Sequence, residues 1–156
     1  MTETKPSFSL KSLSGETHTF PGDGPHLVVF VKEDCETCNT AAPVVEAFYK
    51  AYGDKLRVLM VGQSGADNAV LKDRHHLTLP ILDDATCQVS FDWEIEIVPS
   101  VFWMDADGTV QTHFEGFVRE EWEKLSADLA QSLDLPQAQI DWASLPAWRP
   151  GCGSKH

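Results

Sequence analysis

The four residues Cys35-Glu36-Thr37-Cys38 follow directly after an apolar run, Leu27-Val28-Val29-Phe30-Val31. A continuous β-branched run bounded by turn residues predicts a strand that is buried on both faces. After the cysteines, apolar residues recur at helical spacing from Ala42 to Tyr52 and stop at Gly53, which predicts a helix. The two cysteines are therefore expected at a strand-to-helix junction.

This junction suits thiol chemistry. A thiolate attacks disulfides whereas a thiol hardly does, and the free N–H groups and dipole of a helix N-terminus favour the thiolate. We expect Cys35 to be the exposed attacking thiol and Cys38 the more buried thiol that resolves a mixed disulfide. Three acidic neighbours, Glu33, Asp34 and Glu36, oppose a thiolate. We therefore expect a nucleophile that is less acidified than a helix N-terminus alone would make it.

Patterns elsewhere in the chain predict a mixed α/β architecture. A hairpin is expected over residues 7–20, strands at 56–61, 79–82, 98–104 and 109–114, and helices at 67–76, 86–93 and 119–133. Alternating strands and helices that end in a hairpin and a helix predict a central mixed β-sheet flanked by helices on both sides.

The predicted domain covers residues 1–133 and is followed by an irregular C-terminal tail, 134–156. We expect Trp142 and Trp148 to pin this tail to the domain surface while its last residues hang free.

Composition narrows the function classes. The chain has 156 residues, 42% of them hydrophobic, and a formal net charge of −12. Such an acidic chain is not expected to bind nucleic acid or anionic lipid, and no apolar run is long enough for a membrane span. Residues 1–10 are polar and lack the apolar core of a secretory signal, so we expect a cytoplasmic protein. Four cysteines, of which only two are close, indicate redox or metal chemistry rather than a disulfide scaffold.

Several ordered motifs add to this pattern. They are Phe8-Ser9-Leu10 with Ser14-Gly15-Glu16, Cys35 and Cys38 followed by Pro43, Leu79-Pro80-Ile81-Leu82-Asp83, Val98-Pro99-Ser100, and the 102–108 hairpin. Over about residues 7 to 133, the chain resembles the thioredoxin-like thiol–disulfide oxidoreductases. The resemblance is closest to the branch that holds the TlpA/ResA-type reductases and the AhpC/TSA peroxiredoxins.

This resemblance implies a thioredoxin fold and a role for each matched residue. Cys35 would be the nucleophile and Cys38 the resolving thiol. Pro99 would be a cis-proline that faces the cysteines and excludes metal from the dithiol. Val98, just before it, would offer its backbone to a bound substrate strand. No cofactor is implied.

The chain departs from the family's pattern at four places. Asp34 stands where a tryptophan usually precedes the first cysteine, and the pair between the cysteines is Glu-Thr. Val29 replaces the buried acid of ordinary thioredoxins. Lys32 stands where the peroxiredoxin motif has threonine, which makes a thiol peroxidase the weaker interpretation.

The remaining cysteines and histidines leave alternatives open. Cys35 and Cys38 could belong to a zinc- or copper-binding carrier module completed by Cys152, His113 or His156. Cys87 is expected to be buried and inert. Cys152 is either an exposed thiol of no consequence or an accessory thiol that folds back and exchanges with Cys35.

The sequence thus predicts an enzyme, a dithiol–disulfide oxidoreductase that reduces protein or small-molecule disulfides. A reducing partner, such as thioredoxin reductase or a glutathione-like system, would regenerate its dithiol. The acidic surface favours partners with basic patches.

Overall fold

The structure is a computed structural model that describes residues 3–154. Its centre is a five-stranded sheet in the order β5-β4-β3-β7-β8. The strands are β3 (His26–Phe30), β4 (Arg57–Gly62), β5 (Ile81–Asp83), β7 (Ser100–Met104) and β8 (Val110–Glu115). Strands β3, β4 and β5 are parallel, whereas β7 is antiparallel to both of its neighbours. The predicted central mixed sheet is confirmed.

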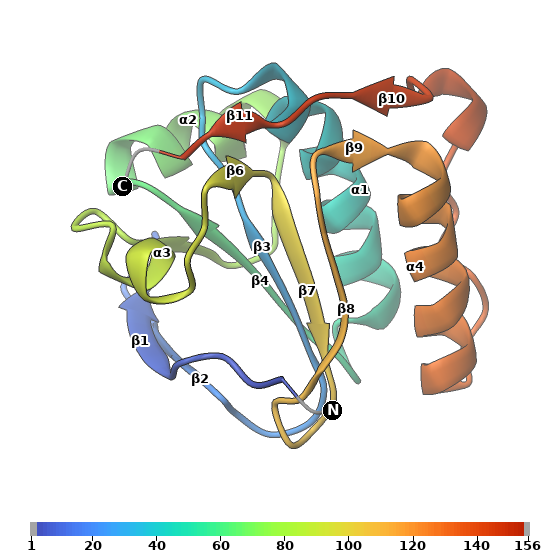
Figure 1. Cartoon of the computed structure of the whole chain (residues 1–156), viewed down its shortest axis with the longest axis horizontal. Helices are drawn as coiled ribbons and strands as arrows, with labels where there is room; N and C mark the ends of the chain where they lie inside the picture. Colours follow the sequence, from blue (N-terminus) through green and yellow to red (C-terminus); the bar gives the residue numbers. More distant parts are fainter. Residues whose placement is uncertain (1–2, 155–156) are drawn as a thin grey trace.

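Helices and a hairpin cover this sheet (Figure 1). Helices α1 (Glu36–Tyr52) and α4 (Arg119–Leu133) lie on one face. The other face carries α3 (Gln88–Asp92) and the predicted N-terminal hairpin, formed by β1 (Phe8–Lys11) and β2 (Thr17–Phe20). Helix α2 (Gly65–His75) packs against β4 and β5.

Strand β3 places the start of α1. All five of its residues are buried, as expected for an apolar run in the middle of a sheet that is covered on both faces. Its backbone is hydrogen-bonded to β4 on one side and β7 on the other. The chain leaving β3 therefore delivers Cys35 to a fixed point at the N-terminus of α1.

An aromatic cluster fastens the hairpin to the sheet. The indole of Trp93 lies 5.1 to 5.8 Å, between ring centroids, from the rings of Phe8, Phe20, Phe30 and Phe102. Such edge-on and tilted contacts bury large apolar areas and are favourable for aromatic pairs. The cluster therefore holds the β3 and β7 strands that carry the site.

The strand predicted over 98–104 is divided in two. Ile97–Val98 forms a short strand, β6, and β7 begins at Ser100. The break falls at Pro99, which has no N–H to donate to a ladder, and the Val98–Pro99 peptide bond is cis. As a result, β6 does not pair with the strands that flank β7.

Strand β6 pairs instead with the C-terminal tail, which contains more secondary structure than the sequence predicts. It contains a 3-10 turn, η1 (Trp142–Ser144), and two short strands, β10 (Trp148–Arg149) and β11 (Cys152–Gly153). Strand β10 pairs with β9 (Phe117–Val118), and β11 pairs with β6. In Figure 1 the tail runs back beside α4 and then crosses above the start of α1.

The prediction about the tail tryptophans is half right. Trp142 is half-buried and packs against the core, but the Trp148 side chain is 62% exposed. The prediction that the last residues hang free is wrong for the described part of the tail. Its last described residue, Ser154, donates its N–H to the Glu96 carbonyl at 2.8 Å. Backbone pairing holds this segment, and hydropathy does not reveal such pairing.

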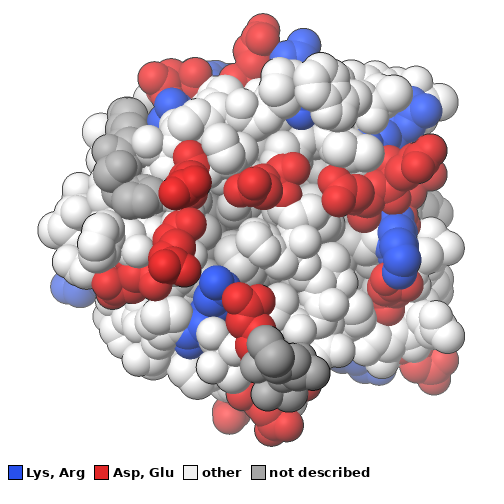
Figure 2. Space-filling model, viewed as in Figure 1, with Lys and Arg blue, Asp and Glu red and all other residues white. Residues whose placement is uncertain are grey.

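The surface carries the charge that the composition requires. Figure 2 shows acidic side chains distributed over one face, with fewer basic ones between them. Within residues 3–154, no helix is long and apolar enough to cross a membrane.

Candidate active site

Cys35 caps the first turn of α1. Its backbone is extended, with φ −107° and ψ 115°, and its Sγ accepts the Cys38 N–H at 3.3 Å. A short turn leads into the cap, because the Cys35 N–H donates to the Lys32 carbonyl. A sulfur in this position receives the free N–H groups that every helix start presents.

Asn39 holds this turn in place, although no sequence pattern predicts this role. Its side-chain amide donates to the carbonyls of Glu33 at 3.0 Å and Cys35 at 2.8 Å. Its Oδ1 accepts from Arg74 and lies 2.6 Å from His75 Nε2. These two residues end α2, so the amide links both helices to the loop before Cys35.

Both cysteines of the motif are fully buried. Cys38 was expected to be buried, and the Lys32 N–H donates to its Sγ at 3.4 Å. The expectation that Cys35 is exposed is wrong, since its exposed fraction is also 0%. The tail is the reason, because Cys152 lies over the thiol.

The tail thiol and the β6 backbone complete the site. The sulfur atoms of Cys35 and Cys152 are 2.6 Å apart, and Cys35 Sγ lies 3.8 Å from the Val98 carbonyl oxygen. Pro99 follows Val98 through its cis bond. The structure therefore brings the four motif positions named in the sequence analysis together with Cys152.

Hydrogen bonds favour the charged form of Cys35. The hydrogen bond from the Cys38 side chain lowers the pKa of Cys35 most. Hydrogen bonds from the Cys152 side chain and from the N–H groups of Cys38 and Thr37 lower it further, whereas burial raises it. The net effect lowers the pKa of Cys35 to about 6. Burial and the neighbouring Cys35 raise the pKa of Cys38 far above its ordinary value, and the same two causes raise the pKa of Cys152.

The expectation that the acidic neighbours limit this acidification is therefore wrong. Each of the three carboxylates is paired with a basic side chain. The pairs are Glu33–Arg74 at 2.6 Å, Glu36–Arg149 at 3.0 Å and Asp34–Lys32 at 3.9 Å. Paired carboxylates cancel much of their field at the sulfur.

Two further side chains bind the tail through contacts that the sequence does not predict. Thr37 Oγ1 donates to the Pro150 carbonyl at 2.5 Å, and Lys32 Nζ donates to the Gly153 carbonyl at 2.8 Å. Both contacts join residues more than a hundred positions apart, so no local pattern announces them.

The other proposed metal ligands do not gather at the dithiol. Within the described part of the chain, no group of three or more His, Cys, Asp or Glu is arranged to hold a metal ion. The His113 ring stacks on Phe102 with centroids 4.1 Å apart, and His156 lies outside the described residues. Cys87 precedes α3 and is half-buried, so the expectation that it is fully buried is wrong.

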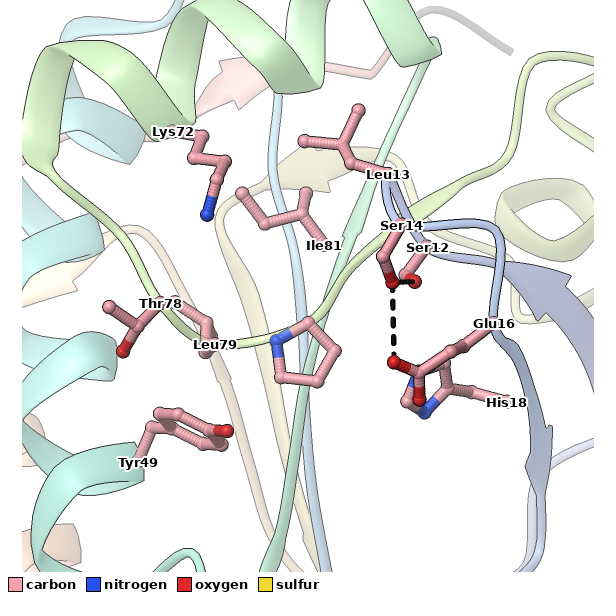
Figure 3. Close-up of a pocket in the computed structure, with 11 residues that line it drawn as sticks. Ser12, Leu13, Ser14, Glu16, His18, Tyr49, Lys72, Thr78, Leu79 and Ile81 are labelled. Carbon is pink, nitrogen blue, oxygen red and sulfur yellow. Dashed lines mark hydrogen bonds between the residues drawn. The ribbon is translucent and has the colours of Figure 1, made fainter.

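A separate cleft of about 510 Å³ opens between the hairpin turn and the loop after α2. Figure 3 shows Lys72 and Tyr49 across this cleft from Ser12 and Ser14. None of its lining residues belongs to the Cys35–Cys38 turn or the tail. Lys72 Nζ donates to the Leu77 carbonyl at 2.9 Å, so its charge already has a structural partner.

The sheet order and the helix-capping dithiol define the chain as a thioredoxin-fold protein with a Cys-x-x-Cys centre. The chain belongs to the AhpC/TSA family, whose sequence model matches residues 1–113. The match ends before α4 and the tail.

Similarity to individual proteins supports this family assignment. The chain is 29% identical over 137 residues to the thioredoxin-like protein YneN of Bacillus subtilis, covering 83% of this chain and 76% of the relative. It is 30% identical over 101 residues to the thiol-disulfide oxidoreductase YkuV of the same organism, covering 60% and 68%. A secreted disulfide oxidoreductase of Mycobacterium tuberculosis shares the fold, with a TM-score of 0.67 and 18% identity over 80% of this chain and 95% of that chain.

Proposed function

We propose that this protein is a dithiol–disulfide oxidoreductase that reduces protein or small-molecule disulfides, with Cys35 as nucleophile and Cys38 as resolving thiol. One observation carries the assignment of roles. The Cys35 sulfur accepts hydrogen bonds at the start of α1, and its pKa is lowered to about 6, whereas burial and the neighbouring Cys35 raise the pKa of Cys38. A thiolate at neutral pH is what the attack requires.

The reaction proceeds by two exchanges. The Cys35 thiolate attacks one sulfur of the substrate disulfide, which forms a mixed disulfide and releases the other half as a thiolate. The Cys38 sulfur then loses its proton and attacks Cys35 Sγ, which releases the second half. The substrate gains two electrons and two protons, and the protein ends with a Cys35–Cys38 disulfide.

The Val98 and Pro99 positions are assigned to substrate binding. The Val98 carbonyl lies beside Cys35 Sγ, and a substrate strand would pair with the edge of the short β6 strand in place of β11. An extended segment added to such an edge receives its affinity from backbone hydrogen bonds and its specificity from side chains. The substrate disulfide would thereby be brought next to the nucleophile.

The proposal includes a reducing compartment such as the cytoplasm and an external reductant, either thioredoxin reductase or a glutathione-like system. The four cysteines form no structural disulfide in the described part of the chain, which supports this direction, since export to an oxidising compartment usually accompanies structural disulfides. A stable dithiol also needs a couple near thioredoxin's roughly −270 mV.

The test is a redox titration of the Cys152→Ser variant, which isolates the motif from the tail thiol. The protein is equilibrated in glutathione buffers, its thiols are alkylated, and tryptic peptides are mapped. We expect one two-electron couple confined to Cys35 and Cys38. Cys87→Ser serves as the matched control because it also removes one thiol.

Two results would overturn parts of the proposal. If Cys35 and Cys38 never form a disulfide in the Cys152→Ser variant, the oxidoreductase function is wrong. If the pair forms but at a potential far less negative than about −270 mV, the protein acts as an oxidant or isomerase instead of a reductase.

A further inference from the structure

The last strand of the tail occupies the edge of β6 assigned above to a substrate. Strand β11 pairs antiparallel with β6, in a register that sets Cys152 opposite Val98. This pairing brings Cys152 Sγ to 2.6 Å from Cys35 Sγ. The tail thus presents its cysteine as a bound substrate strand would present one half of a disulfide.

Contacts on both sides of Cys152 hold it there. On the N-terminal side, the Pro150 carbonyl accepts from Thr37 Oγ1. On the C-terminal side, the Gly153 carbonyl accepts from Lys32 Nζ, and the Ser154 N–H donates to the Glu96 carbonyl. Three groups from separate parts of the domain therefore fix the backbone next to the thiol.

The backbone packs so closely here that only glycine fits. A Cβ on Gly151 would lie 2.3 Å from Ile97 Cγ2 and 2.9 Å from the Val98 carbonyl oxygen. The same Cβ would lie 3.5 Å from the Cα of Gly116. A Cβ on Gly153 would meet nothing within 4 Å. The close approach at Gly151 is specific to docking against β6, whereas the second glycine is not required for it.

We propose that Cys152 is a third redox-active cysteine, which forms an intramolecular disulfide with Cys35. This inference rests on the function proposed above and adds a second resolving thiol to it. After Cys35 attacks a substrate disulfide, the substrate strand leaves the β6 edge and the tail pairs with it again. The Cys152 sulfur then loses its proton and attacks Cys35 Sγ, which releases the substrate's remaining half as a thiol. The substrate receives two electrons, and the protein carries a Cys35–Cys152 disulfide while Cys38 stays a thiol.

This disulfide gives an external dithiol a place to attack. Cys152 is half-exposed, whereas Cys35 and Cys38 are fully buried. A dithiol attacks Cys152 Sγ and displaces Cys35, which leaves readily because its pKa is low. The second sulfur of the reductant then displaces Cys152, so the reductant ends as a disulfide and both protein thiols are restored.

The first experiment maps the disulfide in the wild-type chain. The reduced protein is oxidised with glutathione disulfide at stepped ratios to glutathione, quenched with acid, alkylated and digested with trypsin. Residues 33–50 form one peptide with Cys35 and Cys38, separate from the Cys152 peptide. We expect a cross-link between these peptides that Cys38→Ser retains and Cys35→Ser abolishes.

A Cys152 that is alkylated at every glutathione ratio, beside a Cys35–Cys38 disulfide that forms normally, would overturn the inference and leave the proposed function intact. A cross-link that Cys38→Ser abolishes would also overturn it, because Cys152 would then be bonded to Cys38. If no disulfide involving Cys35 forms in any variant, the proposed function fails as well.

A glycine pair tests whether docking produces the disulfide. Gly151→Ala should reduce the cross-linked fraction at a given glutathione ratio at least about tenfold, the equivalent of about 1.4 kcal/mol. Gly153→Ala should leave it unchanged. The Cys35–Cys38 disulfide must still form in Gly151→Ala, which shows that the domain is folded. An unchanged cross-link in a folded Gly151→Ala variant would contradict the docking that the inference requires.

Discussion

Two segments meet at the Cys35 sulfur, and they are held in different ways. The Cys35–Cys38 turn joins β3 to α1. Its Cys38 is fully buried beneath packed elements, and Cys35 is covered by the tail. The Pro150–Ser154 segment reaches the same sulfur through backbone pairing and a few hydrogen bonds, from 117 positions away. The first segment belongs to the core, and the second lies on its surface.

The difference indicates how the site can open. Unfolding the α1 turn would expose buried apolar side chains, a cost that approaches global unfolding. Releasing the tail breaks two short ladders and a small number of polar contacts, each with a modest net value. A substrate can therefore reach Cys35 by displacing the tail while the domain stays folded.

The largest difference between the two segments is expected in the rate of disulfide reduction. Cys35→Ser should lower turnover of a disulfide substrate by on the order of 10³-fold or more, because no other thiolate stands at the helix cap. Cys152→Ser should lower it by no more than about tenfold, since Cys38 still resolves the mixed disulfide. The measurement is steady-state reduction of a disulfide substrate coupled to a thiol reductant, with Cys87→Ser as control.

Equal losses in the Cys35 and Cys152 variants would show that the tail thiol is indispensable, which would contradict the role given to Cys38. Full activity in Cys35→Ser would remove the nucleophile assignment altogether.

The sequence predicted one of the two segments. The sheet, the hairpin, helix α4 and the dithiol junction follow from apolar periodicity and turn residues close together in the chain. The docking of the tail could not be predicted in this way. It depends on Thr37, Gly151 and the short β6 strand, whose meeting is a property of the folded chain.

The prediction that acidic neighbours limit the acidification of Cys35 was wrong for a related reason. Glu33, Asp34 and Glu36 are visible beside the cysteines in the sequence. Two of their basic partners, Arg74 and Arg149, come from α2 and the tail, and only the fold reveals them. Counting charges along the chain therefore overestimated the repulsion at Cys35.

The pH dependence of the free energy of unfolding tests the Cys35–Cys38 turn, the first of the two segments. Folding lowers the pKa of Cys35 from 9.0 to about 6, so the folded state favours the thiolate. The resulting stabilisation is complete above the unfolded pKa and is lost as the pH falls through about 6. The raised pKa values of Cys38 and Cys152 oppose it only as the pH rises through the unfolded thiol pKa of about 9.

Urea denaturation of the reduced protein between about pH 5 and pH 8.5 measures this effect. The free energy of unfolding of the wild type, relative to Cys35→Ser, should rise by up to about 1.4 kcal/mol per pH unit above about pH 6. A difference that stays constant across this range would show that Cys35 titrates normally in the folded protein.

Thr37 tests the hydrogen bonds that dock the tail. Thr37→Val removes the donor to the Pro150 carbonyl, which should weaken docking by about 1 to 2 kcal/mol. Because alkylation of the buried Cys35 requires the tail to open, its rate should rise about tenfold. Thr40→Val is the matched control, since Thr40 Oγ1 donates to the Glu36 carbonyl within the same helix. Equal alkylation rates in the two variants would show that the Thr37 contact does not control access.

The smallest effect is expected at the ion pair between the two segments. Arg149 and Glu36 are 3.0 Å apart but exposed by 38% and 86%, so the pair contributes only about 0.2 to 1 kcal/mol. Arg149→Gln should raise the alkylation rate of Cys35 by no more than about fivefold at low salt. The difference should disappear at about 1 M salt, where charges are screened beyond roughly 3 Å. Lys124→Gln breaks a comparable pair with Asp128 on α4 and should leave the rate unchanged. A salt-independent increase in Arg149→Gln would mean that the arginine holds the tail through the β10 backbone or its aliphatic stem, and charge pairing would then not contribute to closing the site.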